Sequence, residues 1–248
     1  MSEPYRQDNL LDRISEPGTL EIHYERERER ERQLLERRLK LAGGDVLSVG
    51  CGWHPGRHLF PSPKWRMTGV EVDQAVVDAL VEAGELDEGL AGRAGELPLP
   101  DGSFDVVLYR LVLHHIAWQG PLAPCFEEAH RLLRPGGALV AVEPGSWHPV
   151  GAGLALANRL GVSTLVHGTP DDVPLSPRRL LAESRAAGLE PELHAVTYGW
   201  RRLPGPAQRA LHRLDPLGSR RLAAPLGHTL MLIARRPPLT RNRRTPWE

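Results

Sequence analysis

The sequence predicts an α/β fold in which short buried strands alternate with helices and pair into a mostly parallel sheet. Four apolar runs of the kind that form buried parallel strands occur at 45–49, 67–72, 104–109 and 138–142. Helical patterns over 73–83 and 121–133 lie between them. A glycine-rich turn follows the first run directly, at the position where such sheets bind ligands. We therefore expect helices on both faces of one sheet and a ligand site near the carboxyl ends of its strands.

Residues 1–42 are expected to form an N-terminal helical cap. A short helix is predicted over 8–14 and a longer one over 24–41, where alternating glutamate and arginine lead into Leu34, Leu35, Leu39 and Leu41. Because the apolar stripe occupies only the second half of this helix, we interpret the charge run as a solvated face with ion pairs along it. At the other end of the chain, 237–248 is expected to be a flexible tail.

The C-terminal part of the sequence is less regular. Residues 145–175 are interpreted as an insertion on the substrate side of the sheet. A helix is predicted over 176–187, with Ser176 as its N-cap and proline at its first position. Strands over 192–198 and 228–234 are expected to complete the sheet as an antiparallel edge pair.

Composition narrows the functional classes. The 248 residues include 31 lysines and arginines against 31 aspartates and glutamates, so no overall charge favours nucleic acid as a partner. Cys51 and Cys125 are the only cysteines, which excludes a disulfide framework and a four-thiolate site; no metal is expected. Without a long apolar run or a secretory leader, we expect a cytoplasmic protein that has no membrane span, and the oligomeric state stays open.

The turn after the first strand has the chemistry of a ligand-binding loop. In residues 50–56 (GCGWHPG), the glycines permit close approach of the backbone and leave N–H groups for a ligand. Glu71 follows Gly50 by 21 positions and ends the next strand, where a carboxylate can bind both hydroxyls of a ribose. Such loops serve NAD, FAD, nucleotides and S-adenosylmethionine alike, and a purely structural turn has the same appearance.

Three further segments narrow the choice: 96–107 (ELPLPDGSFDVV), 113–116 (LHHI) and 133–137 (LRPGG). With the glycine loop, they give residues 45–144 a resemblance to the class I S-adenosylmethionine-dependent methyltransferases, in particular the small-molecule group related to the ubiquinone and menaquinone methyltransferases. The resemblance implies a domain over 43–236 with a Rossmann-like, doubly wound sheet of seven strands, mostly parallel with an antiparallel edge strand. It also implies S-adenosylmethionine as cofactor, S-adenosylhomocysteine as product and a small-molecule acceptor.

The resemblance assigns roles only where residues match. The cofactor-binding positions are Gly50, Cys51, Gly52, Glu71, Val72, Ala94, Gly95, Arg110 and Leu111. Among them, Glu71 would bind the ribose, Val72 would pack on the adenine, and Arg110 with Leu111 would face the sulfonium.

Methyl transfer is an in-line displacement that depends on alignment and a dry site, so a base is needed only if the acceptor loses a proton. The candidate catalytic bases are His115 and Glu143, with His114 and His148 as further candidates; a structural role is the alternative for His115. The candidate acceptor-binding residues are Tyr24, His114, Trp147 and His148. Apolar residues in the insertion favour an apolar or aromatic acceptor, although ordinary core packing explains them equally well.

Three features depart from the family pattern. Gly56, the third glycine, is displaced by three intervening residues, and Pro61 and Pro63 shorten the helix that usually follows. Arg93 replaces an acidic residue and cannot accept a hydrogen bond from the adenine amino group. These departures keep open a methyltransferase-like scaffold without catalytic activity. A nicotinamide-dependent oxidoreductase is the other alternative, and the segment 96–107 argues against it.

Overall fold

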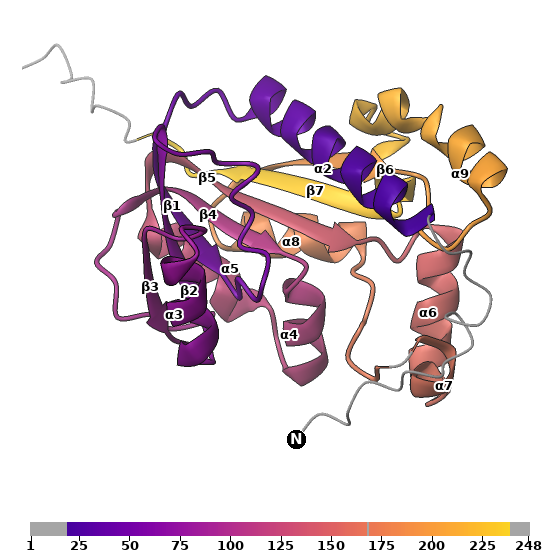
Figure 1. The fold of residues 1–248 in the computed structure, drawn as a ribbon, viewed down its shortest axis with the longest axis horizontal. Helices are drawn as coiled ribbons and strands as arrows, with labels where there is room; N and C mark the ends of the chain where they lie inside the picture. The colour runs from indigo at the N-terminus through magenta and orange to yellow at the C-terminus, as the bar shows by residue number, and fades with distance from the viewer. Residues whose placement is uncertain (1–18, 168, 239–248) are drawn as a thin grey trace, which may run out of the picture.

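Seven strands pair into one sheet in the order β3-β2-β1-β4-β5-β7-β6 (Figure 1). The computed structural model describes residues 19–167 and 169–238. The strands are β1 (Gly44–Val49), β2 (Trp65–Glu71), β3 (Glu88–Ala91), β4 (Phe104–Arg110), β5 (Leu133–Pro144), β6 (Glu190–Thr197) and β7 (Thr229–Arg235). Parallel pairing joins β3, β2, β1, β4 and β5, and β7 runs antiparallel to both β5 and β6. The predicted fold class is confirmed, with the reversed strand one position inside the edge.

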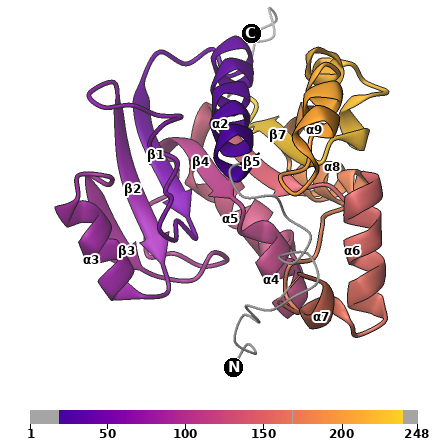
Figure 2. The ribbon, with the colours of Figure 1, turned by 45° about the vertical axis from the view of Figure 1, so that its right-hand side comes forward.

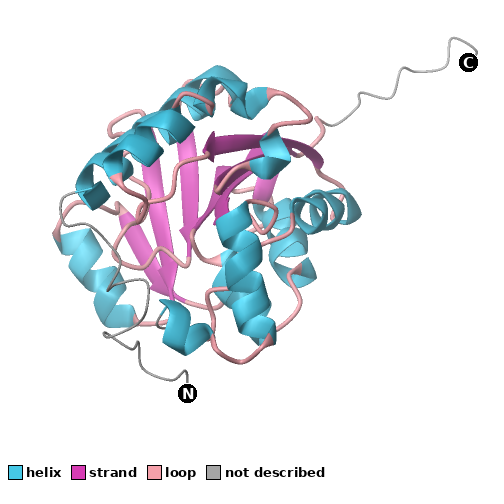
Figure 3. Cartoon of the chain, turned by 90° about the vertical axis from the view of Figure 1, so that its right-hand side faces the viewer, coloured by secondary structure: helices cyan, strands magenta, loops and turns pink. Residues whose placement is uncertain are grey.

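Helices cover both faces of this sheet (Figure 3). One face packs against α5 and α8, which also contact each other, and the other face packs against α2 and α3. The longest helix, α2, is rich in charged residues, and nowhere in the described ranges does a helix combine the length and apolar character needed to cross a bilayer. The α-helices are α2 (Thr19–Arg38), α3 (Gln74–Glu82), α4 (Leu113–Gln119), α5 (Ala123–Leu132), α6 (Pro149–Arg159), α7 (Ser163–His167), α8 (Pro177–Ala186) and α9 (Gly205–His212).

The core lies on both sides of the sheet, because successive side chains of a strand point to opposite faces. On β4, Val107 and Tyr109 pack with the residues of α5 and α8, whereas Val106 and Leu108 pack in the cluster that includes Leu34 of α2. None of these four β4 side chains is more than 1% exposed. The second half of α2 therefore shares one core with the sheet.

The glutamate and arginine residues of α2 are placed differently from the expectation of a solvated face. The charge run of this helix is not only a solvated face, since Glu27 and Glu31, one helical turn apart, are 7% and 1% exposed. Arg32 does form the expected surface ion pairs, with Glu29 and Glu36. Because periodicity in a sequence is read from apolar residues, two buried carboxylates on the inner face of the helix give no signal.

Short elements account for the other differences. The sequence patterns gave no sign of β3, α4 or α9, which have four, seven and eight residues. Ser176 occupies the N-cap of α8 as predicted, but its side chain makes no capping hydrogen bond. The helix expected over 8–14 and the tail from 239 onward lie outside the described residues.

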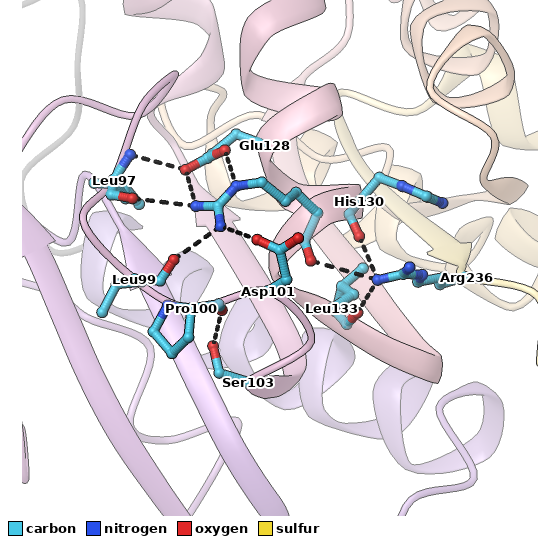
Figure 4. A network of polar contacts seen from close by, with 10 residues as sticks. Leu97, Leu99, Pro100, Asp101, Ser103, Glu128, His130, Leu133 and Arg236 are labelled. Carbon is cyan, nitrogen blue, oxygen red and sulfur yellow. Dashed lines mark hydrogen bonds and ion pairs between the residues drawn. The ribbon is translucent and has the colours of Figure 1, made fainter.

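Residues 96–103 form a loop before β4 that one arginine of α5, Arg131, organises. The Arg131 guanidinium donates to the carbonyl oxygens of Leu97 and Leu99, at 3.1 and 2.8 Å (Figure 4). The same group pairs with the carboxylates of Asp101 and Glu128. Glu128 in turn accepts the N–H of Leu97 at 2.8 Å. These contacts satisfy the polar groups of a loop that has no regular structure, and they fix the approach to β4.

The insertion leaves the sheet and returns to it at adjacent points. The N–H of Ser146 donates to the carbonyl of Leu175 at 2.9 Å, and the N–H of Leu175 donates to the carbonyl of Pro144 at 2.8 Å. Between these points, α6 and α7 pack against each other. Figure 2 shows them at the same end of the molecule as α4. The excursion is thus built on the carboxyl end of β5, where loops of such sheets carry function.

Candidate functional site

The loops that follow β1 and β4 meet where the order of strands in the sheet reverses. Gly50, directly after β1, has a φ of +62°, and a Cβ at this position would lie 2.3 Å from Cγ2 of Val112. Val112 follows β4, so only glycine allows the two loops to pack this closely. In open α/β sheets, ligands bind in the crevice at this reversal point.

The Glu71 carboxylate lies beside the glycine loop at the end of β2. Its Oε2 accepts the N–H of Gly52 at 3.0 Å, and its Oε1 accepts the N–H of Val72 at 2.8 Å. A Cβ on Gly52, whose φ is +45°, would meet no atom within 4 Å. A carboxylate is therefore fixed next to open space bordered by glycine. Each carboxylate oxygen accepts more than one hydrogen bond, so this arrangement fits the two hydroxyls of a ribose.

The structure corrects the expectation that this loop offers free N–H groups. Cys51 donates its N–H to the carbonyl of Val70 at 3.1 Å, and Gly52 donates its own to Glu71. The Cys51 side chain packs in the core, where burial and the Glu71 carboxylate raise the pKa of the thiol to about 11. The backbone N–H and carbonyl of Cys51 are thus engaged with Val70 and His54, and its thiol is held in the core.

The displaced third glycine retains a packing function. The Ser48 hydroxyl donates to the carbonyl of Pro55 at 2.8 Å, which fastens the enlarged loop to β1. At Gly56, where φ is +86°, a Cβ would lie 2.6 Å from Cδ2 of Leu108. The three additional residues of the loop, 53–55, lie before Gly56, and among them Trp53 is 64% exposed.

The positions expected to contact the adenine lie at the ends of β2 and β3. Val72, directly after Glu71, is 68% exposed. Ala94 and Gly95 form a tight turn, closed by a hydrogen bond from the Glu96 N–H to the Arg93 carbonyl at 3.3 Å. The Arg93 side chain is exposed. Val72 thus offers an exposed apolar side chain next to the Glu71 carboxylate, and the turn at Ala94 and Gly95 follows β3, the strand paired with β2.

The Arg110 side chain is committed to α2 and not to the sulfonium position that was expected. Its Nε and Nη2 bind the two oxygens of Glu31 at 3.0 and 3.1 Å. Leu111, the next residue, has a φ of +57°, which is rare for a residue with a Cβ. Its N–H donates to the carbonyl of Val142 at 2.9 Å, and its side chain is exposed. The side chain of Leu111 therefore remains accessible at the crevice, whereas the side chain of Arg110 is occupied by Glu31.

Glu143 is a helix cap, which corrects the expectation that it acts as a base. Its carboxylate accepts the N–H groups of residues 112–114 at 2.8 to 3.3 Å. It also bonds with Nδ1 of His114 at 2.6 Å. Glu143 is 1% exposed, and these contacts engage both of its carboxylate oxygens. Its function is to fix the start of α4 and to orient His114.

Two histidines of α4 face two aspartates of the insertion. Nε2 of His114 lies 3.7 Å from Oδ1 of Asp172, and Nδ1 of His115 lies 3.2 Å from Oδ2 of Asp171. Burial disfavours the charged form of both rings. For His114, the Glu143 carboxylate outweighs burial and raises the pKa, whereas burial and the adjacent His114 lower the pKa of His115. The His115 side chain is 41% exposed, and its lowered pKa favours the unprotonated ring.

The other expected acceptor-binding residues differ in their surroundings. The Tyr24 hydroxyl on α2 accepts a hydrogen bond from Arg201. Trp147 is 39% exposed, with the guanidinium of Arg178 5.2 Å from its ring centroid. His148 is buried and caps α6, since its Nδ1 accepts an N–H of the first turn at 3.3 Å. Tyr24 and Trp147 stay available to a ligand, but the ring of His148 is engaged in the structure of the insertion.

Several charged residues at this end of the sheet have no signal in the sequence. Two lie within the Glu-Arg repeat of α2 and three in loops: Glu27, Glu31, Asp171, Asp172 and Arg201. Only the fold brings them together. In residues 19–167 and 169–238, no group of three or more histidine, cysteine, aspartate or glutamate side chains is placed to hold a metal ion.

Comparisons with known proteins agree with this geometry. Residues 47–141 match the family model described as a methyltransferase domain. The chain is 36% identical over 105 residues to a probable S-adenosylmethionine-dependent methyltransferase of Mycolicibacterium smegmatis, which covers 42% of this chain and 40% of that protein. It is 32% identical over 160 residues to the 27-O-demethylrifamycin SV methyltransferase of Amycolatopsis mediterranei, which covers 61% and 56%.

The fold has solved counterparts. A crystal structure from Thermotoga maritima, described as a possible histamine N-methyltransferase, superposes with a TM-score of 0.63 at 18% identity and covers 88% of this chain and 91% of that one. At this identity the likeness concerns the fold alone. The chain spans 40% and 56% of the lengths of the two sequence relatives. These similarities favour the methyltransferase interpretation over a nicotinamide-dependent oxidoreductase.

Proposed function

Because residues 47–141 match the family model of a methyltransferase domain, we propose that this chain is an enzyme that transfers a methyl group from S-adenosylmethionine to a small molecule. The observation that carries the proposal is the Glu71 carboxylate, fixed by the N–H of Gly52 beside the crevice between the loops after β1 and β4. When bound, S-adenosylmethionine supplies a methyl group on a sulfonium that a nucleophile can attack in line.

The cofactor site proposed here extends along the crevice. Glu71 binds the ribose hydroxyls through charge-assisted hydrogen bonds. Val72 packs against the adenine, and the turn at Ala94 and Gly95 borders its edge. The open space at Gly52 and the exposed side chain of Leu111 support placing the methionine part between the two loops.

His115 is the proposed base for an acceptor that must lose a proton. A base needs an unprotonated, accessible nitrogen near the crevice, and the lowered pKa and partial exposure of His115 meet both conditions. Asp171, 3.2 Å from Nδ1, is proposed to orient the ring so that the opposite nitrogen faces the acceptor. His114, held by Glu143, supports the same wall of the site.

The proposed acceptor is a small molecule with an apolar or aromatic part, bound between α2 and the insertion. Tyr24 and the exposed ring of Trp147 offer aromatic surface at this end of the molecule. The relative from Amycolatopsis is named for a small molecule, 27-O-demethylrifamycin SV. We also propose a cytoplasmic location, because Cys51 and Cys125 are free thiols, as expected in a reducing compartment.

Calorimetric titration with S-adenosylhomocysteine tests the proposal. We expect micromolar binding to the full chain, and we expect Glu71→Ala to weaken it about tenfold or more, since the lost hydrogen bonds involve a charged acceptor. Glu82→Ala, on the exposed surface of α3, is the matched control and should bind like the wild type. Absence of binding would favour a scaffold without catalytic activity, and unchanged binding by Glu71→Ala would remove Glu71 from the site.

A further inference from the structure

Arg201 is a partly buried cation in the loop that follows β6. The loop is held by Gln208, a buried side chain of α9 whose Nε2 donates to the carbonyls of Arg201 and Leu203 at 3.0 and 2.9 Å. The backbone at Arg201 is therefore fixed. Its guanidinium lies over the ring of Tyr24, 5.9 Å from the centroid, and donates a hydrogen bond to the Tyr24 hydroxyl.

In the part of the chain that the structure describes, the guanidinium of Arg201 has a neutral partner, Tyr24, and no directly paired anion. Among these residues, Glu27 and Asp172 act on Arg201 through charge attraction, without forming an ion pair with it. Arg110, the other guanidinium at this end of the sheet, is instead neutralised by the bidentate contact with Glu31. A buried or partly buried cation is ordinarily paired, so Arg201 retains the capacity to bind an anion.

The acidic groups near Arg201 are engaged elsewhere. Glu27 accepts a hydrogen bond from the Thr229 hydroxyl, and burial with the neighbouring Glu31 raises the pKa of Glu27 to about 7. Asp172 lies 3.7 Å from Nε2 of His114. Both carboxylates act on Arg201 only through longer-range attraction.

Arg201 is also adjacent to the proposed acceptor site. Its partner Tyr24 lies on α2. The same helix contains Glu31, which binds Arg110 at the end of β4. The longer-range neighbour of Arg201, Asp172, belongs to the insertion segment that contacts α4. Nearby, Nδ1 of His23 is buried with no hydrogen-bond partner among the described residues, so the polar contacts of this cluster are incomplete.

We propose that Arg201 is an anion-binding subsite of the acceptor site, and that the acceptor is amphipathic, with an apolar body and a carboxylate. The inference rests on the proposed function, because the acceptor whose carboxylate binds Arg201 is the molecule that would receive the methyl group. Tyr24 positions the guanidinium through its hydroxyl. The planar guanidinium would then bind the carboxylate by two parallel hydrogen bonds.

The test compares a carboxylate with its neutral amide. Binding of 4-phenylbutyrate and of 4-phenylbutyramide is measured by calorimetry on the full chain saturated with S-adenosylhomocysteine. We expect the carboxylate to bind about tenfold more tightly than the amide, a typical ratio for a charge-assisted contact. The preference should disappear in Arg201→Met and persist in Arg209→Met, which removes an exposed guanidinium from α9.

A second measurement covers the case in which Arg201→Met does not fold. In the wild type, the arginine Nε–H signals are followed by NMR, with Arg201→Lys identifying the signal of Arg201. This signal should shift with the carboxylate and not with the amide. A wild type that binds the carboxylate no better than the amide, or not at all, overturns the inference, as does an unmoved Arg201 signal. The titration with S-adenosylhomocysteine alone then shows separately whether the proposed function stands.

Discussion

Arg110 at the end of β4 and Glu31 on α2 form a bidentate ion pair that ties the helix to the carboxyl end of the sheet. Their side chains are 11% and 1% exposed, so both charges are removed from water together. His58 adds a contact of 3.2 Å to Glu31. The pair therefore fixes α2 at the carboxyl end of β4, in addition to the packing of its leucines in the core.

Glu31→Ala is expected to lower the free energy of unfolding by about 3 to 5 kcal/mol, because it leaves the Arg110 guanidinium buried without a partner. Urea denaturation followed by circular dichroism measures this change. Glu36→Ala is the matched control. Its side chain is 61% exposed and pairs with Arg32 at the surface, so its removal should cost less than about 1 kcal/mol. Similar decreases in the free energy of unfolding of the two variants would show that the buried pair stabilises the fold no more than the surface pair does.

Glu27 makes stability fall as the pH rises. Burial and the neighbouring Glu31 raise its pKa to about 7 in the folded chain, against 4.5 for the unfolded chain. Thr229, Arg110 and Arg201 also face this group and oppose the shift. Between these two pH values the folded state holds a proton that the unfolded state has lost, so stability declines across this window and levels off above it.

Glu27→Gln should remove that decline. At pH 4.5 the variant and the wild type are expected to be about equally stable, and at pH 8 the variant should be more stable by about 3 kcal/mol. Urea denaturation at a series of pH values gives the difference between the two proteins, in which the contributions of titrating groups distant from Glu27 cancel. Glu25→Gln, at an exposed position of α2, should show no such difference. A constant difference between pH 4.5 and 8 would contradict the assignment.

Much of the fold could be predicted because its strands are short, apolar and buried on both faces. The runs that form β1, β2 and β4 are recognisable as short continuous apolar segments, and the glycine loop and Glu71 mark the ends of two of them. β3 escaped prediction because it has four residues, Glu88–Ala91, of which none is fully buried. A strand at the edge of a sheet needs little apolar character, so its sequence resembles a loop.

The residues of the candidate site could be predicted only where a recognisable local sequence pattern contains them. Glu71 and Gly52 belong to local patterns, and the structure places them in hydrogen-bond contact. Glu143 looked like a base because it ends a strand, yet its function as a cap depends on the N–H groups of α4, 29 to 31 positions away in the chain. The pairing of Asp171 with His115 likewise depends on how the insertion folds back.

Asp171→Asn is expected to lower the pKa of His115. The carboxylate favours the protonated ring, so its removal leaves burial and His114 to lower the pKa further. Proton–carbon NMR of the histidine rings gives this value directly, with His115→Gln identifying the signal. Asp78→Asn, on the exposed face of α3, should leave the titration unchanged. An unchanged or higher pKa of His115 in Asp171→Asn would show that the two side chains do not interact in solution.

The insertion should be separable from cofactor binding. Replacing residues 149–166 by a short glycine-serine linker keeps the contacts of Pro144, Ser146 and Leu175 that close the excursion. We expect the variant to bind S-adenosylhomocysteine like the wild type, because Glu71 and the glycine loop lie outside the replaced segment. Transfer of a radiolabelled methyl group to an identified acceptor should be lost. If the variant unfolds and no longer binds the cofactor, the segment is part of the core instead of a substrate-side insertion.

Arg93→Asp tests how the adenine is recognised. Arg93 is exposed beside the turn at Ala94 and Gly95, so no buried contact is lost when it is replaced. An aspartate there could accept a hydrogen bond from the exocyclic amine of adenine, worth about 1 kcal/mol or somewhat more for a charged acceptor. Calorimetry with S-adenosylmethionine should therefore show equal or up to about tenfold tighter binding, while Arg93→Ala stays near the wild type. A large loss in both variants would mean that the arginine itself contacts the cofactor, for example by stacking its guanidinium plane on the adenine.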